Sequence, residues 1–113
     1  MEKIVEQGIL YDFYGELLTE HQRSIYEDAV YHDLSLSEIA EANGISRQGV
    51  HDLIKRCDKI LLGYEEKLHL VETFMKIKEK VSKIQSLSTQ LEEKHNPEMR
   101  QISRLAQEIL EEL

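Results

Sequence analysis

The sequence predicts an all-α protein with a small N-terminal domain followed by a long helical extension. Apolar side chains recur at steps of three and four residues through most of the 113 residues, which is the period of amphipathic helices. Charged residues make up 32% of the chain, with five Gly and one Pro, a composition unlike that of a turn-rich β-sandwich or a disordered tail. We place the two segments at residues 1–62 and 63–113.

The first two helices are predicted from apolar periodicity and one N-terminal cap. An apolar stripe with interspersed acids covers residues 4–18. Thr19 precedes the next apolar stripe, and Gln22 lies three residues after Thr19, which is the spacing of a capping box. We therefore expect a second helix that ends at residue 31 or 32.

Two further helices are predicted on either side of a glycine turn. Ser35 and Glu38 have capping-box spacing at the start of a short helix, and Gly44 can adopt the left-handed conformation that ends it. Ser46 then caps the next helix. Two helices joined by such a turn are typical of a helix-turn-helix motif. One face of the second helix is apolar and consists of Val50, Leu53, Ile54 and Cys57.

The distribution of charge singles out this second helix. The formal net charge is −8, which opposes non-specific adhesion to nucleic acid or anionic lipid. Residues 1–45 contain two basic and ten acidic side chains, whereas residues 46–59 contain four basic and two acidic ones and are the only net basic stretch. The polar face of the helix carries candidate nucleic-acid contacts, namely Arg47, Gln48, His51 and Lys55. The alternative is a solvated face on a scaffold that does not bind DNA, and Asp52 on the same helix favours it.

The extension is predicted to contain a coiled-coil-like seam and a returning helix. Apolar residues from Leu70 to Leu91 recur at mostly alternating steps of three and four. Gly63 is expected to kink the segment or divide it, and Asn96-Pro97 to begin a last helix that folds back on the long one. The seam either packs against that last helix or forms a homodimer through Phe74, Ile77, Val81 and Ile84.

No catalytic, metal or cofactor site is predicted. Cys57 lies on an apolar stripe, the five His lack metal-ligand spacing, and no phosphate-binding loop is present, so we expect neither an enzyme nor a cofactor. We expect Tyr11, Tyr14, Tyr26 and Tyr31 to lie in the core. No apolar run approaches the roughly 18 residues of a membrane span, and the single cysteine needs no oxidising compartment, so a cytoplasmic location is expected.

Several segments carry a resemblance to known proteins. The stretches Leu18-Thr19-Glu20-His21-Gln22, Leu36-Ser37-Glu38-Ile39-Ala40 and Asn43-Gly44-Ile45-Ser46-Arg47-Gln48-Gly49-Val50 resemble the helix-turn-helix of sigma-factor region 4. With Tyr11-Asp12-Phe13-Tyr14-Gly15 and the Glu/Lys-rich tail, the whole chain resembles the YlxM family of small bacterial proteins. That resemblance implies a sigma-region-4-like fold and a regulatory role connected with the signal recognition particle. The implied partners are DNA or, for an interaction module that does not bind DNA, the particle's GTPase or RNA.

Overall fold

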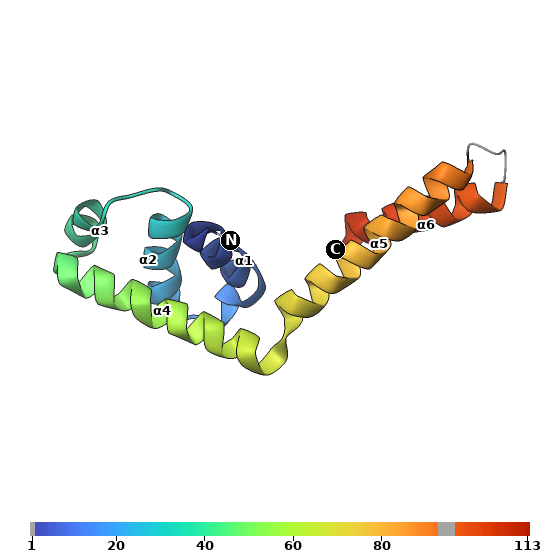
Figure 1. Ribbon diagram of the computed structural model, residues 1–113. Coiled ribbons are helices and arrows are strands. Elements are labelled where there is room, and N and C mark those ends of the chain that lie inside the picture. Colours follow the sequence, from blue (N-terminus) through green and yellow to red (C-terminus); the bar gives the residue numbers. More distant parts are fainter. Residues whose placement is uncertain (1, 93–96) are drawn as a thin grey trace. The chain divides into compact units, whose positions relative to one another are not determined.

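The protein is described by a computed structural model that covers residues 2–92 and 97–113. All regular secondary structure in these residues is helical, which confirms the predicted all-α class (Figure 1). Inter-residue contacts divide the chain into two compact units, Met1–Val71 and Glu72–Leu113. The helices are α1 (Lys3–Tyr14), the 3-10 helix η1 (Gly15–Leu17), α2 (Glu20–Val30), α3 (Leu36–Asn43), α4 (Arg47–Leu68), α5 (Leu70–Glu92) and α6 (Pro97–Glu112).

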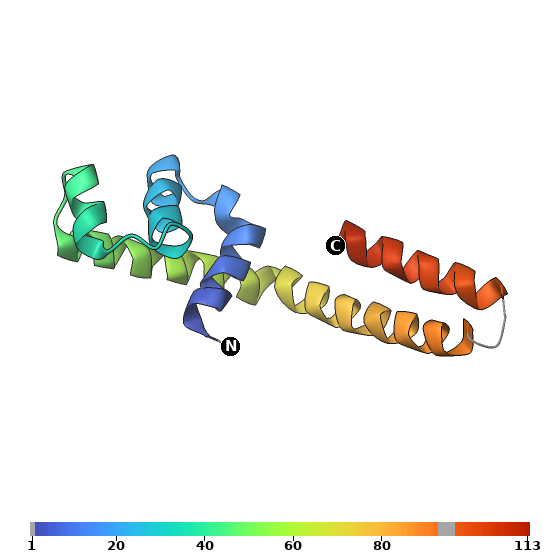
Figure 2. The same cartoon turned by 90° about the horizontal axis from the view of Figure 1, so that it is seen from above.

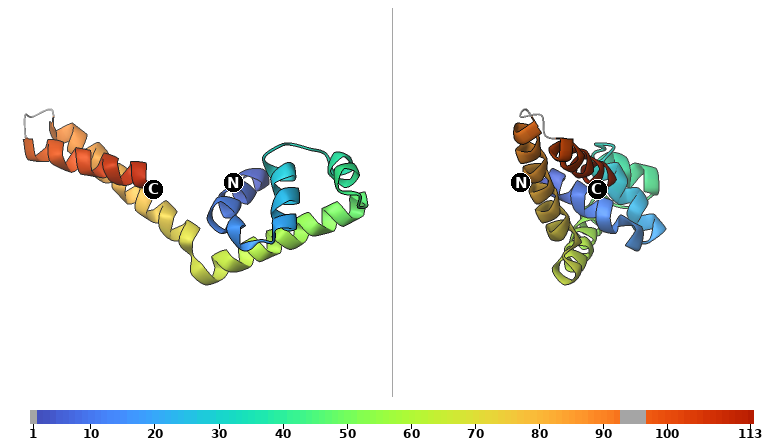
Figure 3. Two further views of the ribbon diagram at one scale, coloured as in Figure 1. Left: turned by 180° about the vertical axis from the view of Figure 1, so that it is seen from behind. Right: turned by 90° about the vertical axis from the view of Figure 1, so that its right-hand side faces the viewer.

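In the N-terminal unit, three helices pack along α4. α3 lies at the N-terminal end of α4, while α1 lies nearer its C-terminal end (Figure 3). Burial of apolar surface at both places stabilises the unit. One core cluster joins α2, α3 and α4 through Ile25, Ile39, Ala40 and Val50. The other joins α1, α2 and α4 through Leu10, Tyr14, Leu18, Tyr26, Cys57 and Leu61.

The predicted helix caps are confirmed. Thr19 with Gln22 and Ser35 with Glu38 each form both hydrogen bonds of a capping box. Ser46 accepts a hydrogen bond of 2.9 Å from the backbone N–H of Gly49 at the start of α4. Gly44 ends α3 with φ of +65°, where a side chain would be strained.

The first helix is shorter than its apolar pattern predicts. The α-helix ends at Tyr14, and residues 15–17 form the 3-10 helix η1. Gly15 is buried so closely against the ring of Tyr11 that a Cβ at this position would lie 2.7 Å from the ring carbon Cε2. The tighter turn therefore depends on a glycine in contact with an aromatic ring.

The break in the long helical segment is not at Gly63. α4 continues through Gly63 to Leu68 and ends at His69, whose backbone is left-handed with φ of +55°. The C-terminal part of α4 belongs to the N-terminal core, because Leu61 is fully buried and Tyr64 stacks on Tyr14 with ring centroids 6.0 Å apart. The boundary between the units therefore follows Val71 instead of lying between residues 62 and 63.

The C-terminal unit is an antiparallel helical hairpin (Figure 2). α6 begins at Pro97 and runs back along α5, as predicted from the proline, whereas Asn96 lies outside the described residues. Val81 and Ala106 are buried between the two helices. Gln85 donates a hydrogen bond to Gln107 across the hairpin. Among the described residues, no helix is both long enough and apolar enough to cross a membrane.

Candidate nucleic-acid interface

The start of α4 packs against α3. Val50 on α4 and Ile39 on α3 are both fully buried in the same cluster. In the turn between the helices, the backbone N–H of Ile45 donates to the carbonyl of Ala40 at 3.2 Å. The side-chain amide of Asn43 donates to the carbonyl of Ile39 at 2.8 Å. These contacts give the first turn of α4 a defined orientation relative to α3, as a helix-turn-helix requires.

The predicted contact residues lie together on one side of α4, where Arg47, Gln48 and Lys55 are exposed and His51 is partly buried. Arg47, His51 and Lys55 are spaced four residues apart, so they form one row along the helix. Arg47, Gln48 and His51 line an open groove of about 490 Å³ together with Leu36 at the start of α3. Lys55 lies one turn further along α4 and outside the groove lining. The structure therefore places three of the four predicted residues in one groove.

The electrostatic setting of this groove is mixed. Arg47 and Gln48 are exposed at the N-terminus of α4, where the helix dipole favours anions and the first turn has no acidic residue. However, Gln48 Nε2 donates a 2.9 Å hydrogen bond to Oδ1 of Asp52. Nδ1 of His51 lies 3.7 Å from the same oxygen, too far for a hydrogen bond. Asp52 therefore adds negative charge beside the candidate contacts and restrains the Gln48 amide.

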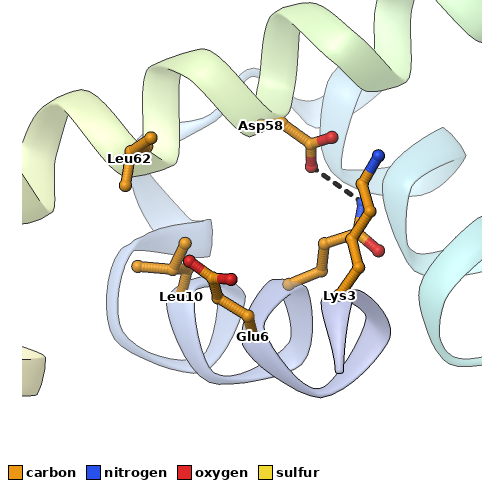
Figure 4. A pocket seen from close by; sticks show the side chains of 6 residues that line it. Lys3, Glu6, Leu10, Asp58 and Leu62 are labelled. Carbon is orange, nitrogen blue, oxygen red and sulfur yellow. Dashed lines mark hydrogen bonds between the residues drawn. The ribbon is translucent and has the colours of Figure 1, made fainter. Parts of the chain in front are cut away.

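The second acid of the basic stretch lies on a different face of α4. Asp58 Oδ1 accepts hydrogen bonds from Nε2 of Gln7 at 2.9 Å and from the hydroxyl of Tyr26 at 2.5 Å. Figure 4 shows Asp58 directed across a pocket toward α1. This pocket of about 130 Å³ lies between α1 and α4. Asp58 therefore serves the packing of α1 and α2 on α4, and Asp52 is the acid that neighbours the groove.

Four tyrosine–carboxylate hydrogen bonds in the N-terminal unit were missed by sequence reasoning. Besides the Tyr26–Asp58 pair, the Tyr14 hydroxyl donates to Glu65 at 2.5 Å. Two further hydroxyls also donate to carboxylates, Tyr11 to Glu27 and Tyr31 to Asp12. The partners are 16 to 51 residues apart in sequence, so no local pattern indicates the pairing. These bonds bring together helices distant in the chain.

The tyrosines differ in burial but share one electrostatic effect. Tyr14 and Tyr26 are buried, as predicted, and Tyr11 is partly buried. Tyr31 is 47% exposed, so the prediction that it lies in the core is wrong. Burial, followed by the hydrogen bond to a carboxylate, raises the pKa of all four phenols. Their environment therefore favours the neutral form.

Cys57 is fully buried in the core, as its place on the apolar stripe predicts. Burial, with a smaller contribution from neighbouring Asp58, raises the pKa of the Cys57 thiol to about 11. Because the thiolate is the reactive form, this thiol is a poor nucleophile. No group of three or more His, Cys, Asp or Glu side chains within the described ranges is arranged to hold a metal ion.

The predicted dimerisation residues all lie on α5 of the C-terminal unit, but they differ in exposure. Val81 is buried against α6, and Phe74 is partly buried. Ile77 and Ile84 are exposed. The two interpretations of the seam therefore concern different residues, because packing against α6 covers part of the set and leaves the rest uncovered.

Comparison with known proteins assigns most of the chain to one protein family. Residues 1–104 match the UPF0122 family, described as "putative helix-turn-helix protein, YlxM / p13 like". A UPF0122 protein of Clostridium botulinum is 53% identical over 98 residues, covering 85% of each chain. One of Clostridium kluyveri is 51% identical over 79 residues, covering 70% of this chain and 71% of its own. One of Bacillus cereus is 44% identical over 102 residues, covering 90% of this chain and 92% of its own.

Proposed function

Because the chain belongs to the UPF0122 family of helix-turn-helix proteins, we propose that it is a regulatory protein that binds duplex DNA through α4. One observation carries the proposal. The net basic stretch at residues 46–59 coincides with the N-terminal half of the helix that follows the glycine turn. In helix-turn-helix proteins this second helix enters the major groove, with its N-terminal residues against base edges.

Each candidate side chain has a chemical role in this proposal. Arg47 can donate two hydrogen bonds to guanine, and Gln48 can pair its amide with adenine. Lys55, further from the N-terminus, supplies a point charge for a phosphate. His51 contacts a base edge or a phosphate beside them. The acidic remainder of the protein keeps non-specific affinity low, so binding depends on this local surface and on salt.

Titration of nucleic acid with the full-length protein tests the proposal. Fluorescence anisotropy would follow labelled duplex DNA and labelled signal-recognition-particle RNA at about 50 and 200 mM salt. Saturable DNA binding is expected, with an affinity loss of about 40-fold at the higher salt if three phosphates are neutralised. Absence of DNA binding from a pool of random duplexes at the lower salt would overturn the proposal.

Removal of the Asp52 charge is expected to strengthen DNA binding. Asp52→Asn retains an oxygen acceptor for Gln48 but removes repulsion of phosphate, so we expect affinity to rise about threefold to tenfold at 50 mM salt. Anisotropy titration measures the change. Asp12→Asn is the matched control, because it also removes one exposed carboxylate but lies on α1. An equal gain in both variants would show that Asp52 acts only through net charge.

A second candidate is an interaction module that contacts the signal recognition particle. The observation that favours it is the charge of residues 1–45, which contain ten acidic and two basic side chains. Complementary charge steers encounters with a basic partner. Co-elution of the protein with purified particle or with its GTPase at low salt, without DNA binding, would favour this function. Neither candidate is enzymatic, and neither requires a cofactor.

A further inference from the structure

The helical hairpin of the C-terminal unit covers only half of its own apolar seam. Apolar or small residues on α5 recur at alternating steps of three and four: Phe74, Ile77, Val81, Ile84, Ser88 and Leu91. The first, third and fifth are buried or partly buried, whereas the second, fourth and sixth are exposed. In a complete coiled-coil seam both sets of positions pack against partner helices.

α6 repeats the same division. Met99 is partly buried and Ala106 is buried, whereas Ile102 and Ile109, which complete the alternating pattern, are exposed. The two sides of the hairpin differ accordingly. On one side polar residues close the contact, with Gln85 bonded to Gln107 and the Thr89 hydroxyl 3.5 Å from that of Ser103. The exposed seam residues of both helices lie toward the other side, which we call the open face.

The positions that border the open face have an unusual composition. On α5 they are Lys80 and Leu87, which directly precede the buried Val81 and Ser88. On α6 they are Leu105, which directly precedes Ala106, and Glu112, seven residues after Leu105. Leu87 is 60% exposed and Leu105 58%, the two largest values among large apolar side chains in the described part of the chain. The α5 border thus combines a lysine with a leucine, and the α6 border combines a leucine with a glutamate.

We propose that the open face is covered by a second copy of this chain, with α5 of each copy packed antiparallel on α6 of the other in a four-helix bundle. The hairpin itself determines which residues of α5 and α6 lie at the same height along the helix axes. Because Gln85 is opposite Gln107 and Thr89 is near Ser103, residue 87 lies level with residue 105, and residue 80 with residue 112. A two-fold axis parallel to the helices preserves these levels. Leu87 of one copy then contacts Leu105 of the other, and Lys80 lies beside Glu112 of the other.

Charge distinguishes this arrangement from its alternative. In the alternative, the two-fold axis lies in the interface and is perpendicular to the helices. It would pack α6 of one copy on α6 of the other, with Glu98 and Glu112 of the two copies on the same shared border. Like charges opposite one another destabilise such a contact. In the proposed bundle both copies of α5 begin at the same end, so both N-terminal units are attached there. The assembly holds in the absence of nucleic acid and does not rest on the proposed DNA binding.

Loss of the leucine contacts tests the proposed dimer. Sedimentation equilibrium of the full-length protein should show a dimer at micromolar concentration. Leu87→Gln with Leu105→Gln should raise the dimer dissociation constant about 100-fold or more, because it removes apolar contacts twice per dimer. Leu17→Gln is the control, since Leu17 is 56% exposed but lies in the N-terminal unit, and it should change the constant less than about threefold. A monomeric wild-type protein, or equal effects of both changes, would overturn the proposal.

Charge reversal tests the orientation with exposed residues whose replacement leaves the helices intact. Lys80→Glu and Glu112→Lys should each weaken the dimer about tenfold, because each places like charges together at two symmetric positions. The two changes combined should restore most of the affinity. If Glu112→Lys alone strengthens association, or if the combination restores nothing, α5 does not pack on α6 of the second copy. Circular dichroism confirms that each variant keeps its helical content.

Discussion

Replacement of Arg47 and Lys55 together by alanine is expected to weaken duplex DNA binding about 100-fold at 50 mM salt. Loss of a bidentate contact to a base costs about 1–3 kcal/mol, and loss of a phosphate contact adds to it. The salt dependence should also become shallower, by about 0.9 in slope for each phosphate contact removed. The fold is expected to persist, because both side chains are exposed while Ile39 and Val50 hold α3 to α4. Anisotropy titration at several salt concentrations measures both effects.

A charge-matched variant separates a specific surface from general electrostatics. Arg56→Ala with Lys67→Ala also removes two positive charges from α4, but these residues lie outside the row formed by Arg47, His51 and Lys55. We expect this control to lose less than about fivefold in affinity. Equal losses in the two double variants would contradict a defined binding surface. Unchanged binding after loss of Arg47 and Lys55 would remove both residues from the mechanism.

An increase in pH from 8 to 11 is expected to lower the free energy of unfolding by up to about 1.4 kcal/mol through Tyr26 alone. Burial and the hydrogen bond to Asp58 raise the pKa of Tyr26. The pKa of Tyr26 is higher in the folded protein than in the unfolded chain, where it is about 10. The neutral phenol therefore stabilises the fold at pH values below about 10, and this stabilisation is lost as the pH rises above 10. Tyr14 acts in the same direction, as does Cys57, whose pKa is raised to about 11. Urea denaturation at several pH values measures the decline.

Tyr26→Phe is the control for this pH dependence. At pH 8 the variant should be less stable by about 1.5–3 kcal/mol, because a hydrogen bond to a carboxylate is lost. Between pH 10 and 11 its stability should decline less steeply than that of the wild type, since one titrating phenol is absent. Parallel declines in the two proteins would show that Tyr26 does not titrate on unfolding.

Local features of the fold were predictable because their causes lie within a few residues. A hydroxyl at the N-terminus of a helix bonds a backbone N–H three residues later, so Thr19, Ser35 and Ser46 could be identified from spacing alone. Gly44 is predictable for the same reason, since a left-handed residue ends a helix locally. Such patterns located the helix-turn-helix and its basic second helix.

The candidate binding residues were predictable as a set, but their electrostatic surroundings were not. The helical period alone places Arg47, His51 and Lys55 in one row. The period does not show that Asp58 points toward α1 and Tyr26 while Asp52 remains beside Gln48. That difference depends on which face of α4 the other helices cover, and it decides which acid opposes DNA binding.

The sequence alone thus established the helices, their caps and the location of the basic surface, because these follow from spacing within one or two turns. Tertiary packing determined where α4 ends, since Tyr14 and Glu65 bind the N–H groups of Leu70 and Val71 after the turn. It also determined which seam residues remain uncovered, because an apolar period shows that a face needs a partner without identifying the partner. Contacts between distant residues form only when helices pack, and their geometry depends on the whole set of side chains at the contact.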